Sequence, residues 1–377
     1  MKVYFSIGNQ PDNLGDVILN RSLIEAFEQR GEVFVDDFYL SDEYLEDFGV
    51  SRDHLISERK DLPNPRTNGG KLSWIFGSQV FQCFSRYPGH YFPRKGFKWL
   101  IHDFKMAVFY TLLKMRGIKV ILVGVTIDTT LLKGLKGFLW RWQASQHELF
   151  SVRDKTIYED LKERGFSTVK HVPDLFLLST RDEEPVVERD LEGRTKRVVI
   201  CLRPDIPEVV DLDATSDLTR MRVAEILDRL DPKVEVVFCF QVDRDGDYVK
   251  SLYEVHKDRP NTRFVSECQT VESAFELYRE TSVILSNRLH CLLYGLTVGA
   301  APVALTDWEQ HTKIRYAWKD FEISDYCFDL NGSVDEGMKT LNSILSDEWP
   351  HRQRLRKRAL QIKQSVVDAL DGALSGI

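Results

Sequence analysis

The stretch Thr281–Thr306, TSVILSNRLHCLLYGLTVGAAPVALT, decides the fold. Its apolar runs at residues 283–285 and 302–305 each predict a buried strand. The residues between them predict a helix that ends at Gly299, because glycine readily adopts the left-handed conformation that ends many helices. Strand, helix and strand in this order form the repeating unit of a parallel α/β sheet.

Arg288 and His290 fall at the start of this helix, just beyond the first strand, and we expect Ser286 and Asn287 to cap it. Backbone N–H groups and the helix dipole make such a position an anion site, at the edge where open α/β sheets bind ligands. Arginine adds a planar cation for phosphate or carboxylate, and histidine exchanges a proton near neutral pH. A surface arginine and a core histidine are the alternative interpretation.

The composition is that of a globular protein with two domains, with 377 residues, 43% hydrophobic and 29% charged. A net charge of −7 argues against a general nucleic-acid binder. The six cysteines form no C-x-x-C pair, so we expect neither a zinc site nor a disulfide framework. The amino terminus does not resemble a secretory signal, and no apolar run has membrane-spanning length. We therefore expect a cytoplasmic protein.

Strands and helices alternate on both sides of one charged segment that is poor in apolar residues. This pattern predicts an α/β fold with two Rossmann-like, doubly wound domains that face a cleft. We expect an amino-terminal domain, a linker, a carboxyl-terminal domain and final helices, over residues 1–180, 181–196, 197–332 and 333–377.

The chain opens with a short apolar strand that runs into the turn-rich loop GNQPDNLGD, residues 8–16. Its glycines allow close approach of the backbone to a ligand, towards which Asn9, Asn13 and Asp16 would point. The dinucleotide fingerprint G-x-G-x-x-G is absent from this loop. A purely structural turn is the alternative.

Three further cations follow predicted strands or open predicted helices. Arg153 lies between a short strand and a helix, like Arg288, and a salt bridge with Asp154 is the alternative explanation of its position. Arg203 follows the predicted strand 197–202, and Lys313 lies beyond the stretch that decides the fold.

Residues 74–109 are rich in aromatic side chains, and the charge turns positive over residues 94–119. Basic residues among large apolar ones are typical of a helix that lies on an anionic membrane. The solvated face of a core helix gives the same pattern, so both interpretations stay open.

Together, three segments resemble the polysaccharide pyruvyl transferase family. They are the GN-x(5)-GD loop at residues 8–16, the S-x-R-D segment at 151–154 with V-P-D at 172–174, and R-L-H at 288–290 followed by the P-V-A-L strand. Arg203 and Lys313 also fall where that family tends to carry an arginine and a lysine. The resemblance covers most of the chain and implies two domains of the GT-B type.

The resemblance implies transfer of pyruvate from phosphoenolpyruvate to two hydroxyls of one sugar, which makes a cyclic ketal. The acceptor would be a sugar or oligosaccharide of a polysaccharide or of its lipid-linked precursor. His290 is the expected general acid and base, and Asp16 would orient or deprotonate an acceptor hydroxyl. We expect the remaining roles to be donor binding by Arg153, Arg288, Leu289, Arg203 and Lys313, and acceptor binding by Asn9 and Asn13. Neither a metal nor a cofactor besides phosphoenolpyruvate as co-substrate is expected.

Two other functions fit the same residues. A GT-B glycosyltransferase that uses a nucleotide sugar would share the cleft and the anion site at the helix start. A non-catalytic member of the family would bind glycans without turnover. The basic aromatic region would suit a lipid-linked acceptor and peripheral contact with the inner face of a membrane. The acceptor sugar, the position and stereochemistry of the ketal and the oligomeric state do not follow from the sequence.

Overall fold

The structure is a computed structural model of the chain. It describes residues 1–7, 13–37, 45, 48–59, 81–91, 93, 96–182, 188–204, 212–266 and 270–375. The chain divides into two compact units, the first with residues 1–11, 16–178 and 364–377 and the second with residues 12–15 and 179–363. The domain ranges predicted from the sequence stay a prediction.

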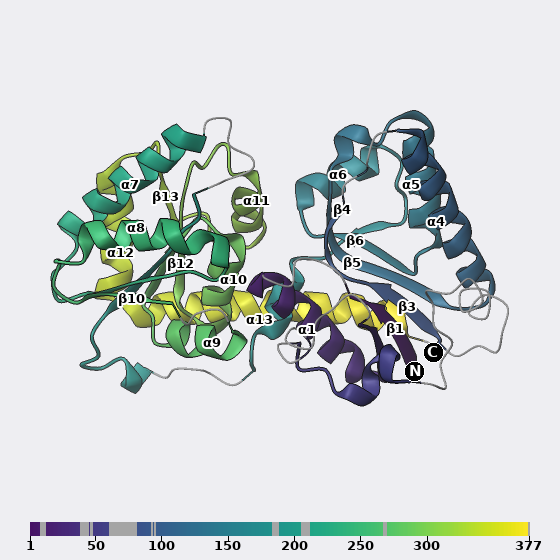
Figure 1. Cartoon of the computed structure of the whole chain (residues 1–377), viewed down its shortest axis with the longest axis horizontal. Coiled ribbons are helices and arrows are strands. Elements are labelled where there is room, and N and C mark those ends of the chain that lie inside the picture. Colours follow the sequence, from purple (N-terminus) through teal and green to yellow (C-terminus); the bar gives the residue numbers. More distant parts are fainter. Residues whose placement is uncertain are drawn as a thin grey trace. The chain divides into compact units, whose positions relative to one another are not determined.

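The first unit contains a parallel sheet in the order β2-β1-β3-β5-β6-β7, with β4 paired to β5 (Figure 1). The chain adds β2 on one side of β1 and then β3 on the other, so the winding direction reverses between β1 and β3. Such a reversal marks the ligand position of a doubly wound sheet. The strands are β1 Lys2–Ser6, β2 Glu32–Asp36, β3 Cys83–Arg86, β4 Gly89–Tyr91, β5 Lys119–Ile127, β6 Leu149–Val152 and β7 Val169–His171.

The helices of the first unit pack on this sheet through apolar faces. In α4, buried residues recur as Asp103, Ala107, Tyr110 and Leu113, and Tyr110 and Leu113 pack in one core cluster with the sheet residue Phe84. Helix α5 lies beside α4 (Figure 1). The helices are α1 Leu14–Glu28, α4 Phe97–Met115, α5 Gly134–Gln146 and α6 Lys155–Glu163.

The second unit contains a parallel sheet in the order β10-β9-β8-β11-β12-β13 (Figure 1). Its winding reverses between β8 and β11, so the ends of these two strands mark the expected ligand position. The strands are β8 Arg197–Cys201, β9 Glu235–Cys239, β10 Thr262–Val265, β11 Val283–Ser286, β12 Ala301–Thr306 and β13 Cys327–Asp329.

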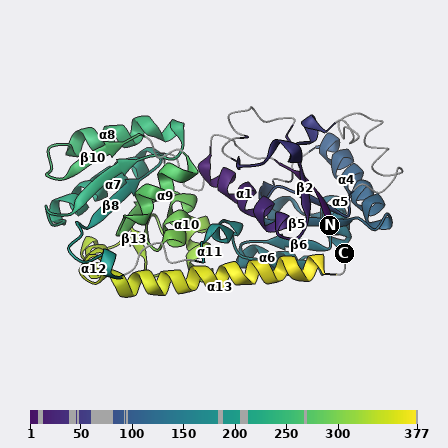
Figure 2. The same cartoon turned by 90° about the horizontal axis from the view of Figure 1, so that it is seen from below.

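The last helix, α13, is continuous, and its residues up to Lys363 belong to the second unit and those from Gln364 to the first (Figure 2). The helices that follow the first unit's α6 along the chain are α7 Leu212–Arg229, α8 Gly246–His256, α9 Val271–Arg279, α10 Leu289–Val298, α11 Thr312–Asp320, α12 Val334–Ser346 and α13 Glu348–Leu374.

The predicted fold class of two Rossmann-like units is confirmed. The opening stretch forms β11, α10 and β12 as expected, and Gly299 ends α10 with a left-handed φ of 80°. Every residue of β11 and β12 is buried, as the continuous apolar runs predict for strands covered on both faces.

Candidate functional site

In the second unit, Asn287 joins the loops that follow β8 and β11. Its side-chain oxygen accepts a hydrogen bond from the backbone N–H of Arg203 at 2.9 Å, and its amide donates to the carbonyl of Arg203 at 3.0 Å. The expectation that Asn287 caps α10 is therefore wrong, because both ends of its side chain are used by Arg203. The pair places Arg203, which is half-buried, at the reversal point of the sheet.

Arg288 is the residue immediately before α10 rather than part of its first turn. Its backbone is extended, with φ −103° and ψ 118°, and no side chain caps the helix. The predicted cap by Ser286 is also wrong, since the Ser286 hydroxyl accepts a hydrogen bond from the N–H of Arg288 itself, at 3.0 Å. The first N–H groups of α10, beginning with that of Leu289, have no partner within the helix and can bind an anion.

The side chain of Arg288 forms an ion pair with Asp245, and the two side chains are only 9% and 1% exposed. Burial raises the pKa of Asp245 although the neighbouring guanidinium opposes this shift. Burial also works against the charge of Arg288, but the carboxylate of Asp245 outweighs this effect and raises the pKa of Arg288. Asp245 therefore fixes Arg288 in place, and a bound anion would share the cation with this carboxylate.

His290 is the second residue of α10 and is half-buried. Gly15, which belongs to the short segment 12–15 of the second unit, lies directly against it. A Cβ atom at Gly15 would stand 1.8 Å from the imidazole Nδ1, so only glycine fits beside His290 in this position. Asn13 accepts a hydrogen bond from the N–H of Gly15 at 3.2 Å, and Asn9 lies outside the described residues.

Lys313 is the second residue of α11 and is half-buried. The helix follows β12 after a short loop in which the buried His311 lies 2.7 Å from the hydroxyl of Thr306, between Nδ1 and Oγ1. Lys313 therefore follows the carboxyl end of β12, which is the strand next to β11 in the sheet. The sequence analysis did not single out His311 as a residue that anchors the loop before Lys313.

In the first unit, Arg153 follows β6 and is buried in a network of polar groups. Its guanidinium donates to Asp174 at 2.8 Å and to the hydroxyl of Thr126 at 2.8 Å, while Asp154 is 4.0 Å away. The ion pair with Asp154 that the alternative explanation proposed is therefore present, but Arg153 makes a shorter ion pair with Asp174, which the sequence did not indicate. Thr126 in turn donates to Asp154 at 2.8 Å.

Burial disfavours the charged form of Arg153, but the carboxylates of Asp174, Asp154 and Asp16 outweigh this effect and raise its pKa. Asp16 is the acidic residue in the first turn of α1 and is half-buried. Asp16 and Arg153 therefore interact electrostatically within the first unit. The remaining cations predicted for the donor, Arg288, Arg203 and Lys313, belong to the second unit.

Arg86 is a site candidate that the sequence analysis missed. It ends β3 at the reversal point of the first sheet, and it helps to line a pocket of about 220 Å³ under α4 and α5. Its guanidinium donates to the Tyr110 hydroxyl at 3.1 Å and lies 5.7 and 5.1 Å from the ring centres of Tyr87 and Tyr91. Within the described part of the chain, no carboxylate forms an ion pair with Arg86.

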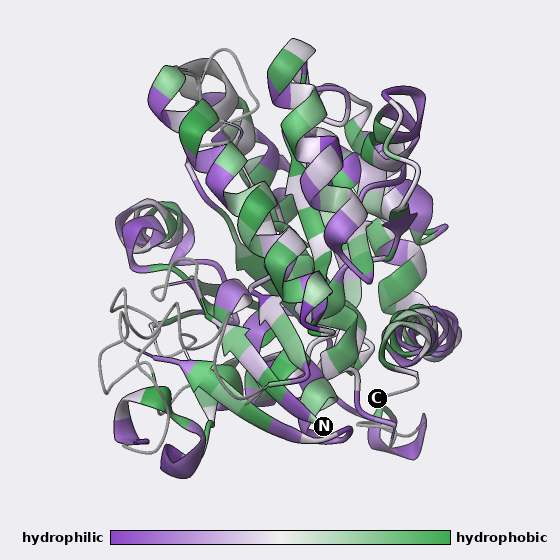
Figure 3. Cartoon of the chain, turned by 90° about the vertical axis from the view of Figure 1, so that its right-hand side faces the viewer, coloured by the Kyte–Doolittle hydropathy of each residue, from purple (hydrophilic) through white to green (hydrophobic). Residues whose placement is uncertain are grey.

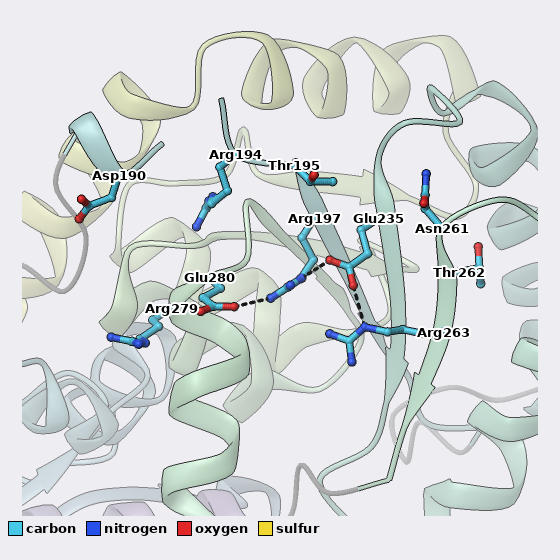
Figure 4. Close-up of a pocket in the computed structure, with 10 residues that line it drawn as sticks. All are labelled: Asp190, Arg194, Thr195, Arg197, Glu235, Asn261, Thr262, Arg263, Arg279 and Glu280. Atoms are coloured by element: carbon cyan, nitrogen blue, oxygen red, sulfur yellow. Dashed lines mark hydrogen bonds and ion pairs between the residues drawn. The ribbon is translucent and has the colours of Figure 1, made fainter. Parts of the chain in front are cut away.

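A larger cavity, of about 800 Å³, lies at the opposite edge of the second sheet, where β8, β9 and β10 begin (Figure 4). Its charges are largely paired. Arg197 donates to Glu235 at 2.6 Å and to Glu280 at 3.0 Å, and Arg263 also reaches Glu235, at 2.6 Å. The cavity exceeds the Arg86 pocket in size, but it lies away from the strand ends that carry Arg288 and His290.

Among the described residues there is no cluster of three or more histidine, cysteine or acidic side chains that could hold a metal ion. In the same residues, no helix combines the length and the apolar character that crossing a bilayer requires.

Comparison with known proteins gives one family and one fold. The model of the family described as "Polysaccharide pyruvyl transferase" matches residues 13–307. No curated protein matches the chain significantly.

Solved structures with the same architecture include UDP-GlcNAc 2-epimerase from Neisseria meningitidis bound to UDP-GlcNAc, with 11% identity, coverage of 98% and 99% of the two chains and a TM-score of 0.57. The enzyme of the same name from Methanocaldococcus jannaschii has 10% identity, coverage of 92% and 94%, and a TM-score of 0.55. An Anabaena protein solved with UDP and glucose has 11% identity, coverage of 98% and 99%, and a TM-score of 0.52. At these identities the likeness shows the GT-B-type fold alone.

Proposed function

This chain belongs to the polysaccharide pyruvyl transferase family, and we propose that it transfers pyruvate from phosphoenolpyruvate to two hydroxyls of one sugar, forming a cyclic ketal. The observation that carries the proposal is the position of Arg288 and His290 at the start of α10. That position combines a buried cation, backbone donors and a half-buried imidazole at the reversal point of a parallel sheet.

Phosphoenolpyruvate offers a phosphate and a carboxylate, so its site must supply several positive groups. In the second unit, Arg288 and the N–H of Leu289 would bind one anionic group, with Arg203 and Lys313 as further cations. In the first unit, Arg153 is the cation assigned to the donor. Asp245 and Asp174 would act by holding Arg288 and Arg153 in fixed orientations.

The reaction begins with protonation of the methylene carbon, and His290 is the residue to which we assign this step. The electrons of the double bond form the new C–H bond, which leaves a positive centre on the carbon that carries the phosphate. One sugar hydroxyl adds to that carbon and loses its proton, and phosphate leaves with the electrons of its C–O bond. The second hydroxyl adds and loses its proton, giving the ketal and one phosphate.

We assign acceptor binding to the first unit and to the segment before α1. Asp16 would orient or deprotonate an acceptor hydroxyl, and Asn9 and Asn13 would bind the sugar. The Arg86 pocket is a further part of this acceptor side, because aromatic rings stack on sugars and the arginine suits an anionic substituent. We also propose that the acceptor sugar belongs to a polysaccharide or to its lipid-linked precursor, and that the protein acts in the cytoplasm.

A direct test incubates the purified chain with phosphoenolpyruvate and a panel of hexoses and N-acetylhexosamines, both free and as lipid-linked diphosphates. We expect phosphate release that depends on one acceptor, with an equal amount of a product whose mass and NMR spectrum are those of a pyruvate ketal. Release of phosphate without a ketal product, or no use of phosphoenolpyruvate with any acceptor, contradicts the proposal.

A nucleotide-sugar glycosyltransferase is the second candidate. The observation in its favour is that solved proteins of this fold were captured with UDP-GlcNAc or with UDP and glucose. The same acceptor panel supplied with UDP-sugars distinguishes the two, since a glycosyltransferase would release UDP and leave phosphoenolpyruvate unchanged.

A further inference from the structure

Helix α4 has two faces of different character. Asp103, Ala107, Tyr110 and Leu113 point into the first unit, as their burial shows. On the other face Phe97, Ile101 and Phe104 are 76%, 41% and 51% exposed. Their spacing of four and three residues puts these three side chains in one row along the helix. Three large apolar side chains therefore stand in water on a helix that already has a buried face.

Helix α5 extends this row sideways. Leu135 and Phe138 are 59% and 52% exposed. Trp142 connects the two helices, because its ring centre lies 6.0 Å from that of Phe104 on α4 and 6.4 Å from that of Phe138. We call Phe97, Ile101, Phe104, Leu135 and Phe138 the outer apolar face. Figure 3 looks onto the side of the first unit that α4 covers, and hydrophobic bands face the viewer there.

Single exposed apolar residues are ordinary, but a connected group of five marks a surface that meets an apolar partner. The other exposed large apolar side chains among the described residues are Met115, the last residue of α4, and Met221 and Val255, which are single ones on α7 and α8. The concentration of such residues on α4 and α5 therefore needs its own explanation.

The charges around the outer apolar face are positive. Lys98 and Lys105 are exposed on α4, next to Phe97 and Phe104, and the exposed Lys133 precedes α5. The single acidic residue of the two helices, Asp103, is buried and forms an ion pair with Lys136 at 3.0 Å. This positive rim is a local feature, because the whole chain has a net charge of −7.

We propose that the outer apolar face docks on the surface of an anionic lipid bilayer. The aromatic and aliphatic side chains would enter the boundary between head groups and acyl chains, and the lysines would contact anionic head groups. Charge complementarity selects this partner over a second copy of the chain, whose outer apolar face would present the same positive rim. The inference concerns binding to lipid and does not depend on the ketal chemistry.

The experiment measures binding of the full chain to sedimented vesicles, either of phosphatidylcholine alone or with phosphatidylglycerol. We expect binding to the anionic vesicles that weakens as salt is raised. Replacing both rim lysines, Lys98→Gln with Lys105→Gln, should weaken it by about thirtyfold, since each basic residue contributes about 1 kcal/mol near such a surface. Replacing Phe104→Ser and Phe138→Ser should weaken binding to both kinds of vesicle by at least about tenfold.

The matched control changes an exposed apolar and an exposed basic residue on α8 of the second unit, Val255→Ser with Lys250→Gln, and should bind like the parent. Equal binding of parent and outer-face variants, or no binding to anionic vesicles, overturns the proposal. The proposal is also overturned if the parent chain is dimeric by light scattering and stays dimeric with vesicles, while the phenylalanine variant is monomeric. That result assigns the outer apolar face to self-association. None of these readouts requires enzyme activity, so failure here leaves the proposed reaction untouched.

Discussion

The guanidinium of Arg153 donates to the carboxylate of Asp174 over 2.8 Å, and the two side chains are 6% and 4% exposed. The residues come from different segments, since Arg153 follows β6 and Asp174 follows β7, its neighbour in the sheet. Asp174 also accepts a hydrogen bond from the N–H of Phe176 at 3.0 Å, which fixes the carboxylate. The carboxyl ends of two adjacent strands are thereby held together by one buried ion pair.

Asp174→Ala should strongly destabilise the fold, because it leaves the buried Arg153 without its closest carboxylate. Breaking a buried pair by removing one partner costs about 3–5 kcal/mol. Urea unfolding of parent and variant measures the loss. The matched control is Asp182→Ala, whose pair with Lys363 is at the surface, with the carboxylate 85% exposed, and should cost less than about 1 kcal/mol. Equal losses in the two variants would show that the Arg153–Asp174 pair contributes no more than a surface pair.

Stability should depend on pH through Glu348, whose side chain is 1% exposed. Burial disfavours its charged form, but Arg352, Arg194 and the Ser282 hydroxyl outweigh burial and lower its pKa below 4.5. A lowered folded-state pKa means that this stabilisation is present above pH 4.5 and is lost as the pH falls through the folded-state value. The difference in unfolding free energy between the parent and Glu348→Gln should therefore shrink when the pH is lowered from about 5 to about 3, across the unfolded-state pKa and towards the folded-state pKa. A difference that stays constant over this range would contradict the assigned cause.

His290→Asn should lower kcat for pyruvyl transfer by on the order of 10² to 10⁴, the usual contribution of a positioned acid or base. The variant should unfold at the same temperature as the parent, since the imidazole is only half-buried. His54→Asn, which removes a histidine paired with Glu28 at the surface, is the control and should keep full activity. Near-normal turnover by His290→Asn would remove this residue from the proton-transfer role.

Arg86→Gln should raise the KM for an anionic acceptor by about tenfold or more while leaving the KM for phosphoenolpyruvate unchanged, because a charge-assisted pair contributes about 1.5–3 kcal/mol. Arg86→Lys keeps the charge and should recover part of the affinity. Steady-state kinetics with each substrate varied in turn separates the two effects. A change in both KM values, or in neither, would argue against an acceptor role for the Arg86 pocket.

Local pattern predicted much of the fold. The apolar run at residues 302–305 was expected as a buried strand and lies within β12, because a continuous apolar run fits a strand buried on both faces. The end of α10 at Gly299 also followed from sequence, since a left-handed residue there favours glycine.

The carboxylates that pair most closely with Arg288 and Arg153 could not be predicted from the local sequence pattern. Asp245 and Asp174 reach Arg288 and Arg153 only after the sheet has brought separate strand ends together, and no local spacing records that contact. Asn287 was assigned to helix capping because its type favours caps, but tertiary hydrogen bonds to Arg203 took both ends of its side chain. A signal for Arg86 existed, namely an arginine that ends a strand, but the surrounding aromatic residues obscured β3.

The central claim is that phosphoenolpyruvate binds at the start of α10, and thermal unfolding with added ligand tests it most directly. A ligand that binds only the folded chain stabilises it by about 2.7 kcal/mol at a hundred times its Kd. Phosphoenolpyruvate should raise the Tm of the parent and of the control Arg354→Gln, whose exposed side chain pairs with Asp325, but not that of Arg288→Gln. A rise with UDP-GlcNAc and none with phosphoenolpyruvate, or an equal rise with phosphoenolpyruvate in Arg288→Gln, would contradict the claim.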